Sequence, residues 1–359
     1  MKIICIIPTL ESGGAERILS TLANAWMGKG YNVTFLTYIE ADDFFELDTR
    51  INRIPLKLSG GSVVNRICNH IYRVTRVRKI LKQAQPDIVV SFLDIPNIIS
   101  IMSSIGTNIP VIISERTDPE KYKCTFPFNF LRRIFYHFAD CLVIQNNKQQ
   151  LFFDTMIKNI TVINNPAPLD KVCCDQDRFT SKVIVAAGRL GQEKGYDLLI
   201  KAFLKISAKY PEWNLKILGE GTERETLEKL ISDQSLQSRV ALPGRTTDVL
   251  TNLQQSGIFV LSSRFEGVPN AMLEALACEC PVIATECNDA IRNLITDGEN
   301  GLLVPTEDVD ALADALDRLI SDEELRQKFS DNSRGSIKHL HIDNILKQWD
   351  ELFSEVLKK

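Results

Sequence analysis

Two glutamates in the C-terminal half of the chain, Glu266 and Glu274, have a spacing that suits a ligand-binding site. Between them the sequence runs through Gly267 and Pro269 into an apolar stretch typical of a helix, and proline is favoured at the first helical position. A helix start presents backbone N–H groups and a positive dipole end, which suit a phosphate. Carboxylates beside such an anion site can accept hydrogen bonds from sugar hydroxyls. The alternative interpretation is a surface acid followed by a buried capping acid.

Two cations follow an apolar segment upstream. Residues 183–187 are rich in alanine and β-branched side chains and predict a buried parallel strand. Gly188, Arg189 and Lys194 come next, before a helix expected to begin near Asp197. Ligands of open α/β sheets bind at the carboxyl ends of strands, where two fixed cations can stabilise a departing diphosphate without a metal. Taken alone, an Arg and a Lys in a loop are more often solvated surface charges.

The elements that must position these residues form two parallel, doubly wound α/β halves. Strands are expected at residues 3–7, 33–38, 87–92, 111–114, 141–145 and 161–164, and again at 183–187, 215–218, 240–242, 258–261 and 282–284. Helices lie between them, and the break at residues 164–168 is the expected hinge. We therefore predict a first domain over residues 1–168, a second over 178–338, and a C-terminal helix within 339–359.

Several loop motifs resemble one known family. Gly188-Arg189, then Glu193-Lys194-Gly195, and two glutamates separated by seven residues are similar to the retaining, nucleotide-sugar-dependent glycosyltransferases of family 4. Segments 13–17, 218–221, 243–245 and 297–302 also match the family, in its order and along nearly the whole chain. The resemblance implies the GT-B fold, in which two Rossmann-like α/β domains face a cleft and the last helix crosses back to the first domain.

The resemblance also implies roles for single residues. Arg189 and Lys194 would neutralise the leaving diphosphate, Glu266 would hold the donor sugar, and Glu274 would hold the nucleotide ribose. The other residues expected to bind the donor are Gly188, Arg245, Gly267, Val268, Pro269, Asn270 and Ala271. The residues expected to bind the acceptor or the sugar are Gly13, Gly14, Glu16, Arg17, Glu115 and Arg116. Many members have a histidine in the loop where this chain has Glu115 and Arg116, so either of the two is a candidate for its role.

The composition is typical of a soluble globular protein, which we expect to stay in the cytoplasm. The chain has 359 residues, 44% of them hydrophobic, and nine cysteines without a zinc-type spacing, which favours buried free thiols over a metal site. The apolar residues 3–6 are too few for a signal peptide, and no run approaches transmembrane length. We expect a UDP-linked hexose or N-acetylhexosamine as co-substrate, with no cofactor and no metal.

Charge separates the two halves of the chain. Residues 1–170 hold 19 Lys and Arg against 15 Asp and Glu, whereas the remainder holds 23 against 31. Residues 49–86 contain no acid, and within them Val64, Ile67, Ile71, Val74 and Leu81 are expected on one apolar stripe of a helix, with Arg66, Arg73 and Arg76 mostly on the other side. A second basic and aromatic stretch covers residues 126–138. These stretches predict contact with an anionic membrane surface, although an ordinary helix with a solvated cationic face has the same pattern.

The predicted acceptor follows from this charge and from the resemblance. Loops 13–17 and 114–119 are similar to those of bacterial enzymes that extend polyprenyl-diphosphate-linked glycans in O-antigen or surface-polysaccharide assembly, at the inner face of the inner membrane. A family member with a soluble or other lipid acceptor is one alternative. Another is a catalytically silent subunit that binds nucleotide sugars, although such a subunit has no reason to keep Arg189, Lys194, Glu266 and Glu274.

Two other function classes fit less well. A dehydrogenase of this architecture needs Gly-x-Gly-x-x-Gly after its first strand, but here that loop reads Ser12-Gly13-Gly14-Ala15. Nucleic acid is a poorer partner because the whole chain has a net charge of −4 and contains no recognised binding module.

Overall fold

The fold is described from a computed structural model, which covers residues 1–39, 44–56, 63–117, 119, 127–172 and 180–358. The side chains of residues 63–68, 147 and 148 are excluded, so Arg66 and residue 126 of the basic stretches lie outside the description. The chain forms two compact units. The first consists of Met1–Asn165 and Asp343–Lys359, and the second of Pro166–Ile342.

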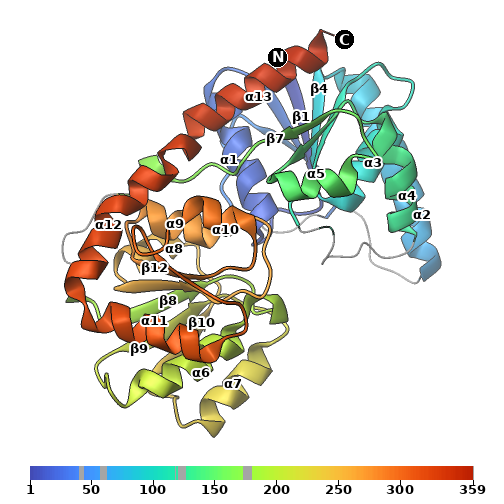
Figure 1. Ribbon diagram of the computed structural model, residues 1–359. Helices are drawn as coiled ribbons and strands as arrows, with labels where there is room; N and C mark the ends of the chain where they lie inside the picture. The colour runs from blue at the N-terminus through green and yellow to red at the C-terminus, as the bar shows by residue number, and fades with distance from the viewer. Residues whose placement is uncertain (40–43, 57–62, 118, 120–126, 173–179, 359) are drawn as a thin grey trace. The chain divides into compact units, whose positions relative to one another are not determined.

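The first unit is built on a parallel seven-stranded sheet in the order β3-β2-β1-β4-β5-β6-β7 (Figure 1). Its strands are β1 (Lys2–Ile7), β2 (Asn32–Thr37), β3 (Asn52–Pro55), β4 (Ile88–Phe92), β5 (Val111–Ser114), β6 (Cys141–Ile144) and β7 (Ile160–Val162). All but β3 were predicted, because their apolar β-branched runs are typical of strands buried on both faces. The edge strand β3 reads Asn-Arg-Ile-Pro and has no such run.

Helices cover both faces of this sheet. They are α1 (Gly14–Gly28), α2 (Val63–Ala84), α3 (Asp94–Ser104), α4 (Phe128–Phe135) with the short η1 (Tyr136–Phe138), and α5 (Asn147–Phe153). Side chains of α2, α3, η1 and α5 share one core with Ile4 and Ile6 of β1. Successive strand residues point to opposite faces, so Phe92 of β4 points to the face opposite Val89. The helix α1 and the C-terminal helix pack on the face of Phe92.

The last helix, α13 (Ile342–Leu357), belongs almost wholly to the first unit, as predicted for this fold. Trp349 of α13 packs edge-on against Trp26 of α1, with ring centroids 5.5 Å apart, and both rings contact Phe353. Asp350 accepts a hydrogen bond of 2.9 Å from the Tyr31 hydroxyl. These contacts bury all three large rings, so α13 completes the core of the first unit.

The outward face of α2 differs from the prediction. Ile71, expected on one apolar stripe with Leu81, is 63% exposed whereas Leu81 is buried, and Arg73, expected on the other side, is half-buried over the ring of Tyr38. The buried side of α2 is set by Val77 and Leu81. Ile71 lies six residues from Val77, which turns it about 120° around the helix axis, while Arg73 lies four residues from Val77 and is turned by only about 40°. The expected stripe is therefore divided between the surface at Ile71 and the core at Leu81, and Arg73 lies nearer the buried side than was expected.

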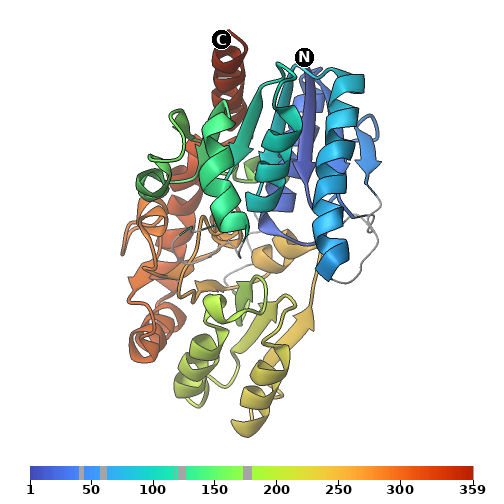
Figure 2. The ribbon, with the colours of Figure 1, turned by 90° about the vertical axis from the view of Figure 1, so that its right-hand side faces the viewer.

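The second unit contains a parallel six-stranded sheet in the order β10-β9-β8-β11-β12-β13 (Figure 2). Its strands are β8 (Val183–Ala187), β9 (Asn214–Leu218), β10 (Val240–Gly244), β11 (Ile258–Leu261), β12 (Val282–Thr285) and β13 (Leu302–Val304). Its helices are α6 (Tyr196–Ser207), α7 (Arg224–Asp233), α8 (Val249–Gln254), α9 (Asn270–Ala277), α10 (Asp289–Leu294), α11 (Val309–Ser321) and α12 (Glu323–Ile337). Helices α6, α7 and α11 share one core against the sheet. Among the described helices of both units, none combines the length and apolarity needed to cross a bilayer.

Candidate active site

The two predicted cations and Glu266 lie at the carboxyl edge of the second sheet. The strand order runs outward in opposite directions from β8 and β11, which are hydrogen-bonded neighbours. Such a reversal opens a crevice between the two loops that follow these strands, and ligands of open α/β sheets bind there. Arg189 and Lys194 come from the loop after β8, and Glu266 comes from the loop after β11.

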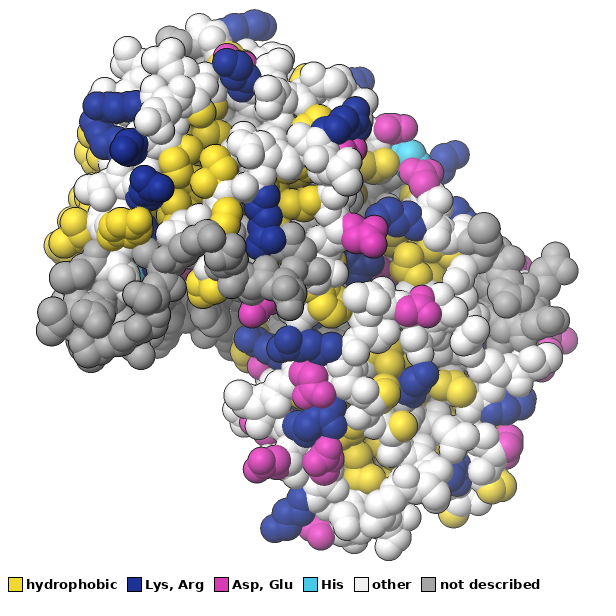
Figure 3. All heavy atoms as spheres, turned by 180° about the vertical axis from the view of Figure 1, so that it is seen from behind, with side chains coloured by type: hydrophobic (Ala, Val, Ile, Leu, Met, Phe, Trp, Pro, Cys, Tyr) yellow, Lys and Arg dark blue, Asp and Glu magenta, His cyan; other side chains and the backbone are white. Residues whose placement is uncertain are grey.

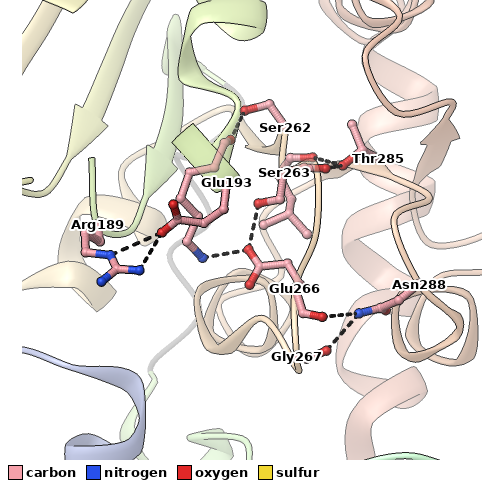
Figure 4. Close-up of polar contacts among 10 residues, drawn as sticks. Arg189, Glu193, Ser262, Ser263, Glu266, Gly267, Thr285 and Asn288 are labelled. Carbon is pink, nitrogen blue, oxygen red and sulfur yellow. Dashed lines mark hydrogen bonds and ion pairs between the residues drawn. The ribbon is translucent and has the colours of Figure 1, made fainter. Parts of the chain in front are cut away.

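An ion pair joins the two loops. Lys194 Nζ lies 2.6 Å from Glu266 Oε1, and the Ser263 hydroxyl donates to the same oxygen at 2.6 Å (Figure 4). The side chains of Lys194 and Glu266 are only 20% and 9% exposed, so solvent screens their attraction little. A carboxylate has two oxygens with about four acceptor sites. Glu266 can therefore bind further hydroxyl groups while it holds Lys194.

Arg189 projects away from this pair. Its side chain is 70% exposed and bonds to Glu193, four residues on, with an Nη2–Oε1 distance of 2.7 Å. Burial raises the pKa of Glu193, but the hydrogen bond from Arg189, a backbone hydrogen bond and the charge of Lys194 outweigh it and lower the pKa overall. Exposed pairs of this kind contribute little stability. The Arg189 guanidinium can therefore exchange Glu193 for a ligand anion at low cost.

Arg264 ties the two loops together. Its guanidinium bonds both carboxylate oxygens of Asp197 at 2.9 and 3.0 Å and donates to the Gln192 carbonyl at 2.8 Å. The Ser262 hydroxyl donates to the Lys194 carbonyl at 2.9 Å. Gly195 between them has φ +62°, and a Cβ there would collide with the Ser262 carbonyl oxygen. The loops can approach this closely only with glycine at that position.

Asn288 fixes the backbone beside Glu266. Its Nδ2 donates to the carbonyls of Glu266 and Gly267 at 2.7 and 2.9 Å, while its Oδ1 accepts from Ile291 N as the N-cap of α10. Neither Asn288 nor Arg264 was predicted as a site residue. The sequence carries a signal for the cap, an asparagine directly before a helix, but none for its long-range bonds.

The predicted phosphate-binding helix start is present as α9. Pro269 was expected at the first helical position, but its extended conformation makes it the N-cap, and the helix begins at Asn270. Gly267 and Val268 lie in the loop before it, and Ala271 lies in the first turn. Glu274 lies in the second turn and is 3% exposed, on the inner side of the helix.

Two other donor-site candidates lie outside this network of contacts. Gly188 directly follows β8 and donates its N–H to the Leu218 carbonyl at 2.9 Å. Arg245 is exposed after β10, two strands from β8, about 10 Å away at the usual strand spacing. Its charge acts on Glu220, whose pKa is lowered first by a hydrogen bond from Arg224 and further by the charges of Arg224 and Arg245.

The loop after β1 meets α1 at the corresponding edge of the first sheet, whose order reverses between β1 and β4. Gly13 is the N-cap of α1, Gly14 begins it, and Arg17 N donates to the Gly13 carbonyl at 3.0 Å. Glu16 folds back so closely that a Cβ on Gly13 would collide with its carboxylate. Burial raises the pKa of Glu16.

Glu115 and Arg116 follow β5 at the same edge and point in opposite directions. Glu115 is buried and accepts a short hydrogen bond from the Tyr136 hydroxyl within the core. Burial is the main cause that raises its pKa to about 7. Arg116 lies over the Phe92 ring, 3.9 Å from the centroid. This placement favours Arg116 over Glu115 as the side chain that meets a ligand. Among the described residues, no three His, Cys, Asp or Glu side chains are grouped to hold a metal.

Comparison with known proteins identifies the family. Residues 12–171 match the family model described as Glycosyltransferase Family 4, and residues 176–336 match Glycosyl transferases group 1. The chain is 31% identical over 359 residues to a Campylobacter jejuni protein, covering 99% of each. That protein is named as an alpha-1,4-N-acetyl-D-galactosaminyltransferase acting on GalNAc-alpha-(1->4)-GalNAc-alpha-(1->3)-diNAcBac-PP-undecaprenol.

Solved structures share the fold. Sucrose-phosphate synthase from Thermosynechococcus elongatus superimposes on this chain with a TM-score of 0.85 at 17% identity. The superposition covers 99% of each of the two chains. HepE of Anabaena, solved in complex with UDP, has a TM-score of 0.80 at 19% identity, over 99% of this chain and 100% of that one. Together with the two parallel-sheet units and the returning helix, the matches place this chain in the GT-B glycosyltransferases of family 4.

Proposed function

We propose that the chain transfers a sugar, with retention of its anomeric configuration, from a nucleotide diphosphate to a polyprenyl-diphosphate-linked glycan in bacterial surface-polysaccharide or O-antigen assembly. The observation that carries the proposal is the Lys194–Glu266 pair between the loops after β8 and β11, beside the start of α9. The name of the Campylobacter jejuni relative, an enzyme acting on an undecaprenol-linked glycan, supports the acceptor class.

The leaving group is the nucleotide diphosphate. Lys194 and Arg189 supply two positive charges, and the first turn of α9, from Asn270 and Ala271, supplies backbone N–H donors and a positive dipole end. Gly188, Arg245, Gly267, Val268 and Pro269 line the same sheet edge as donor-binding residues. Fixed cations stabilise the negative charge that develops on the leaving nucleotide diphosphate, so the proposed transfer needs no metal ion.

Glu266 holds the hydroxyl groups of the donor sugar, and Glu274 holds those of the nucleotide ribose. Attack from the same face as the departing phosphate gives retention, and the phosphate oxygen then accepts the proton of the acceptor hydroxyl. The α-linkage in the relative's name agrees with retention from an α-linked donor. The proposed donor is a UDP-linked hexose or N-acetylhexosamine, supported by the UDP complex of HepE.

The first unit binds the acceptor. Gly13 and Gly14 bring backbone N–H groups to the start of α1, and Glu16 and Arg17 follow in its first turn. Arg116 lies at the end of β5 in the same sheet. Parallel strands bring these loops to one edge, so an acceptor glycan can contact both.

The acceptor is membrane-bound, and one face of the first unit suits an anionic bilayer. We define the lipid face by the exposed apolar residues Ile71, Tyr72, Phe130, Ile134 and Phe138 and the exposed cations Arg76, Lys79 and Arg133. His70 of α2 packs against Phe128 at the start of α4, 4.8 Å between ring centroids, which joins the two helices. Neither helix contains an acid. Figure 3 shows hydrophobic side chains interspersed with Lys and Arg on the first unit.

The lipid face gives the protein a peripheral position on the cytoplasmic side of the inner membrane. Aromatic rings enter the headgroup region while cations contact anionic lipids, and each nearby cation adds about 1 kcal/mol.

Transfer from labelled donors tests the function directly. Purified protein is incubated with a panel of UDP-hexoses and UDP-N-acetylhexosamines, in EDTA, with polyprenyl-diphosphate-linked glycans of one to four sugars. Labelled lipid with an α-linked new sugar is the expected product. Transfer only to soluble sugars, a β-linkage, or activity that requires added metal would each contradict the corresponding part of the proposal.

A further inference from the structure

An arginine with unused donors lies at the carboxyl edge of the first sheet. Arg116 Nε and Nη2 are both out of contact with solvent and have no hydrogen-bond acceptor. These two nitrogens share one edge of the guanidinium plane, the edge with which arginine binds two oxygens of a carboxylate or phosphate. Leaving buried donors without acceptors lowers stability. The arrangement is therefore unfavourable unless a ligand supplies the acceptors.

The rest of the guanidinium is held in place by the protein. Its Nη1 donates to Asn165 Oδ1 at 2.6 Å, and the same oxygen accepts from Gln145 Nε2 at 2.7 Å. The guanidinium lies over the Phe92 ring, which in turn stacks on Trp349 of α13 with ring planes 24° apart. One face and one nitrogen of Arg116 are thus fixed, and this orients the unused edge.

The charge of Arg116 has no counterion in the described structure. Its neighbour Glu115 turns away to Tyr136. Burial without a partner lowers the pKa of Arg116 to about 9, so the side chain remains positively charged at neutral pH. A buried, positively charged fork with no anion beside it would gain from binding one.

We propose that Arg116 binds two oxygens of one phosphate in a substrate diphosphate through Nε and Nη2. The inference rests on the proposed function, which supplies two such groups: the polyprenyl diphosphate of the acceptor and the nucleotide diphosphate of the donor. Arg116 lies on the same sheet edge as the Gly13–Gly14 loop, two strands away, or about 10 Å. An acceptor of this length fits that distance, because a short glycan separates its phosphate from the hydroxyl group that reacts.

Binding to three probes tests the inference. The dissociation constants of inorganic pyrophosphate, UDP and farnesyl diphosphate are measured by calorimetry on the full-length protein. Arg116→Lys keeps the positive charge but removes the pair of donors on one edge. We expect it to raise the dissociation constant of at least one of the three diphosphates by about 10- to 100-fold. If only the affinity for farnesyl diphosphate falls, Arg116 binds the diphosphate of the acceptor. If only the affinity for UDP falls, it binds the diphosphate of the donor. Arg78→Lys is the matched control, because among the described residues Arg78 donates to the carbonyls of Ser103 in α3 and Ile105 just after it.

A second variant separates binding from folding. Asn165→Asp gives Arg116 a carboxylate partner, so it should raise the melting temperature while it weakens diphosphate binding. An arginine with a purely structural role predicts higher stability and unchanged binding. If the wild-type protein binds none of the probes, or if Arg116→Lys binds all three as the wild type does, the inference is wrong.

These measurements need no turnover. If no donor is transferred but Arg116→Lys still loses diphosphate affinity, the proposed function fails and the phosphate site stands.

Discussion

Lys194 Nζ and Glu266 Oε1 lie 2.6 Å apart, between the two strands at which the second sheet reverses its order. The lysine follows β8 and the glutamate follows β11, so the ion pair spans the crevice where a ligand of this fold binds. A diphosphate in that crevice would compete with Glu266 for the lysine. We expect Lys194 to turn toward the phosphate and Glu266 to accept hydrogen bonds from sugar hydroxyls, so that contacts to the substrate replace the ion pair in the complex.

Removing the lysine tests this role. Lys194→Ala should lower kcat by about 10²- to 10³-fold, or 2.7–4 kcal/mol in the barrier, because one preorganised group opposite the leaving charge is lost. Steady-state kinetics with saturating donor and acceptor measure the change. Lys205→Ala is the control, since Lys205 forms an exposed pair with Asp310 in the same unit. Wild-type turnover in Lys194→Ala would remove this side chain from the chemistry.

Asn288 should affect the reaction without touching a substrate. Asn288→Ala releases the Glu266 and Gly267 carbonyls and the cap of α10, so kcat/KM for the donor should fall about tenfold and stability by about 1–2 kcal/mol. Asp308→Ala removes the cap of α11 alone and serves as the matched control. Equal activity in the two variants would show that Asn288 only stabilises the fold.

The lipid face predicts two separable effects on vesicle binding. Phe130→Ser with Phe138→Ser should weaken co-sedimentation with phosphatidylglycerol vesicles at any salt concentration, because these two exposed rings supply apolar contact. Arg133→Gln should weaken it by about fivefold at low salt and less at high salt. Lys201→Gln, an exposed lysine in the second unit, is the control. Equal binding to neutral and anionic vesicles would argue against the electrostatic part.

The sequence predicts strands well where both faces of the sheet are covered. Residues 183–187, 111–114 and 258–261 match β8, β5 and β11 at both ends, because an apolar run bounded by polar residues fixes a buried strand. The edge strand β3 was missed because its pairing with β2, rather than its composition, makes it a strand. On α2, the helical repeat was clear, but the expected stripe is divided between the surface at Ile71 and the core at Leu81, and Arg73 lies nearer the buried side than expected. Only the neighbouring elements determine which side of a helix is buried.

The loops of the site were predicted, but their internal contacts were not. Arg189, Lys194 and Glu266 were placed on these loops because charged residues follow predicted strand ends. Arg264 and Asn288 hold these loops through bonds to residues 67–72 and 21–22 positions away. Such pairs come together only when the sheet forms. A single sequence carries no local signal for them.

The last helix should be essential for the stability of the first unit. Trp349→Ala removes a fully buried ring that contacts Trp26, Phe92 and Phe353, and it should cost about 3–5 kcal/mol in unfolding free energy. Near-ultraviolet circular dichroism during thermal unfolding follows the loss. Leu357→Ala, in the exposed last turn, should change the melting temperature little. Similar melting temperatures for the two variants would mean that α13 contributes little to the core.

Glu115 should make the stability of the first unit fall as pH rises. Its pKa is about 7 in the folded chain, raised mainly by burial, against an ordinary value of 4.5. Between these two pH values the folded state holds a proton that the unfolded state has lost. The contribution of the protonated Glu115 to the unfolding free energy is therefore complete below about pH 4.5 and gone above about pH 7. Glu115→Gln mimics the protonated acid. Its unfolding free energy relative to wild type should rise by up to about 3 kcal/mol from pH 4.5 to pH 8. Urea unfolding at both pH values measures this difference, with the exposed Glu11→Gln as the control. A difference that is the same at both pH values would show that the buried carboxyl group titrates normally.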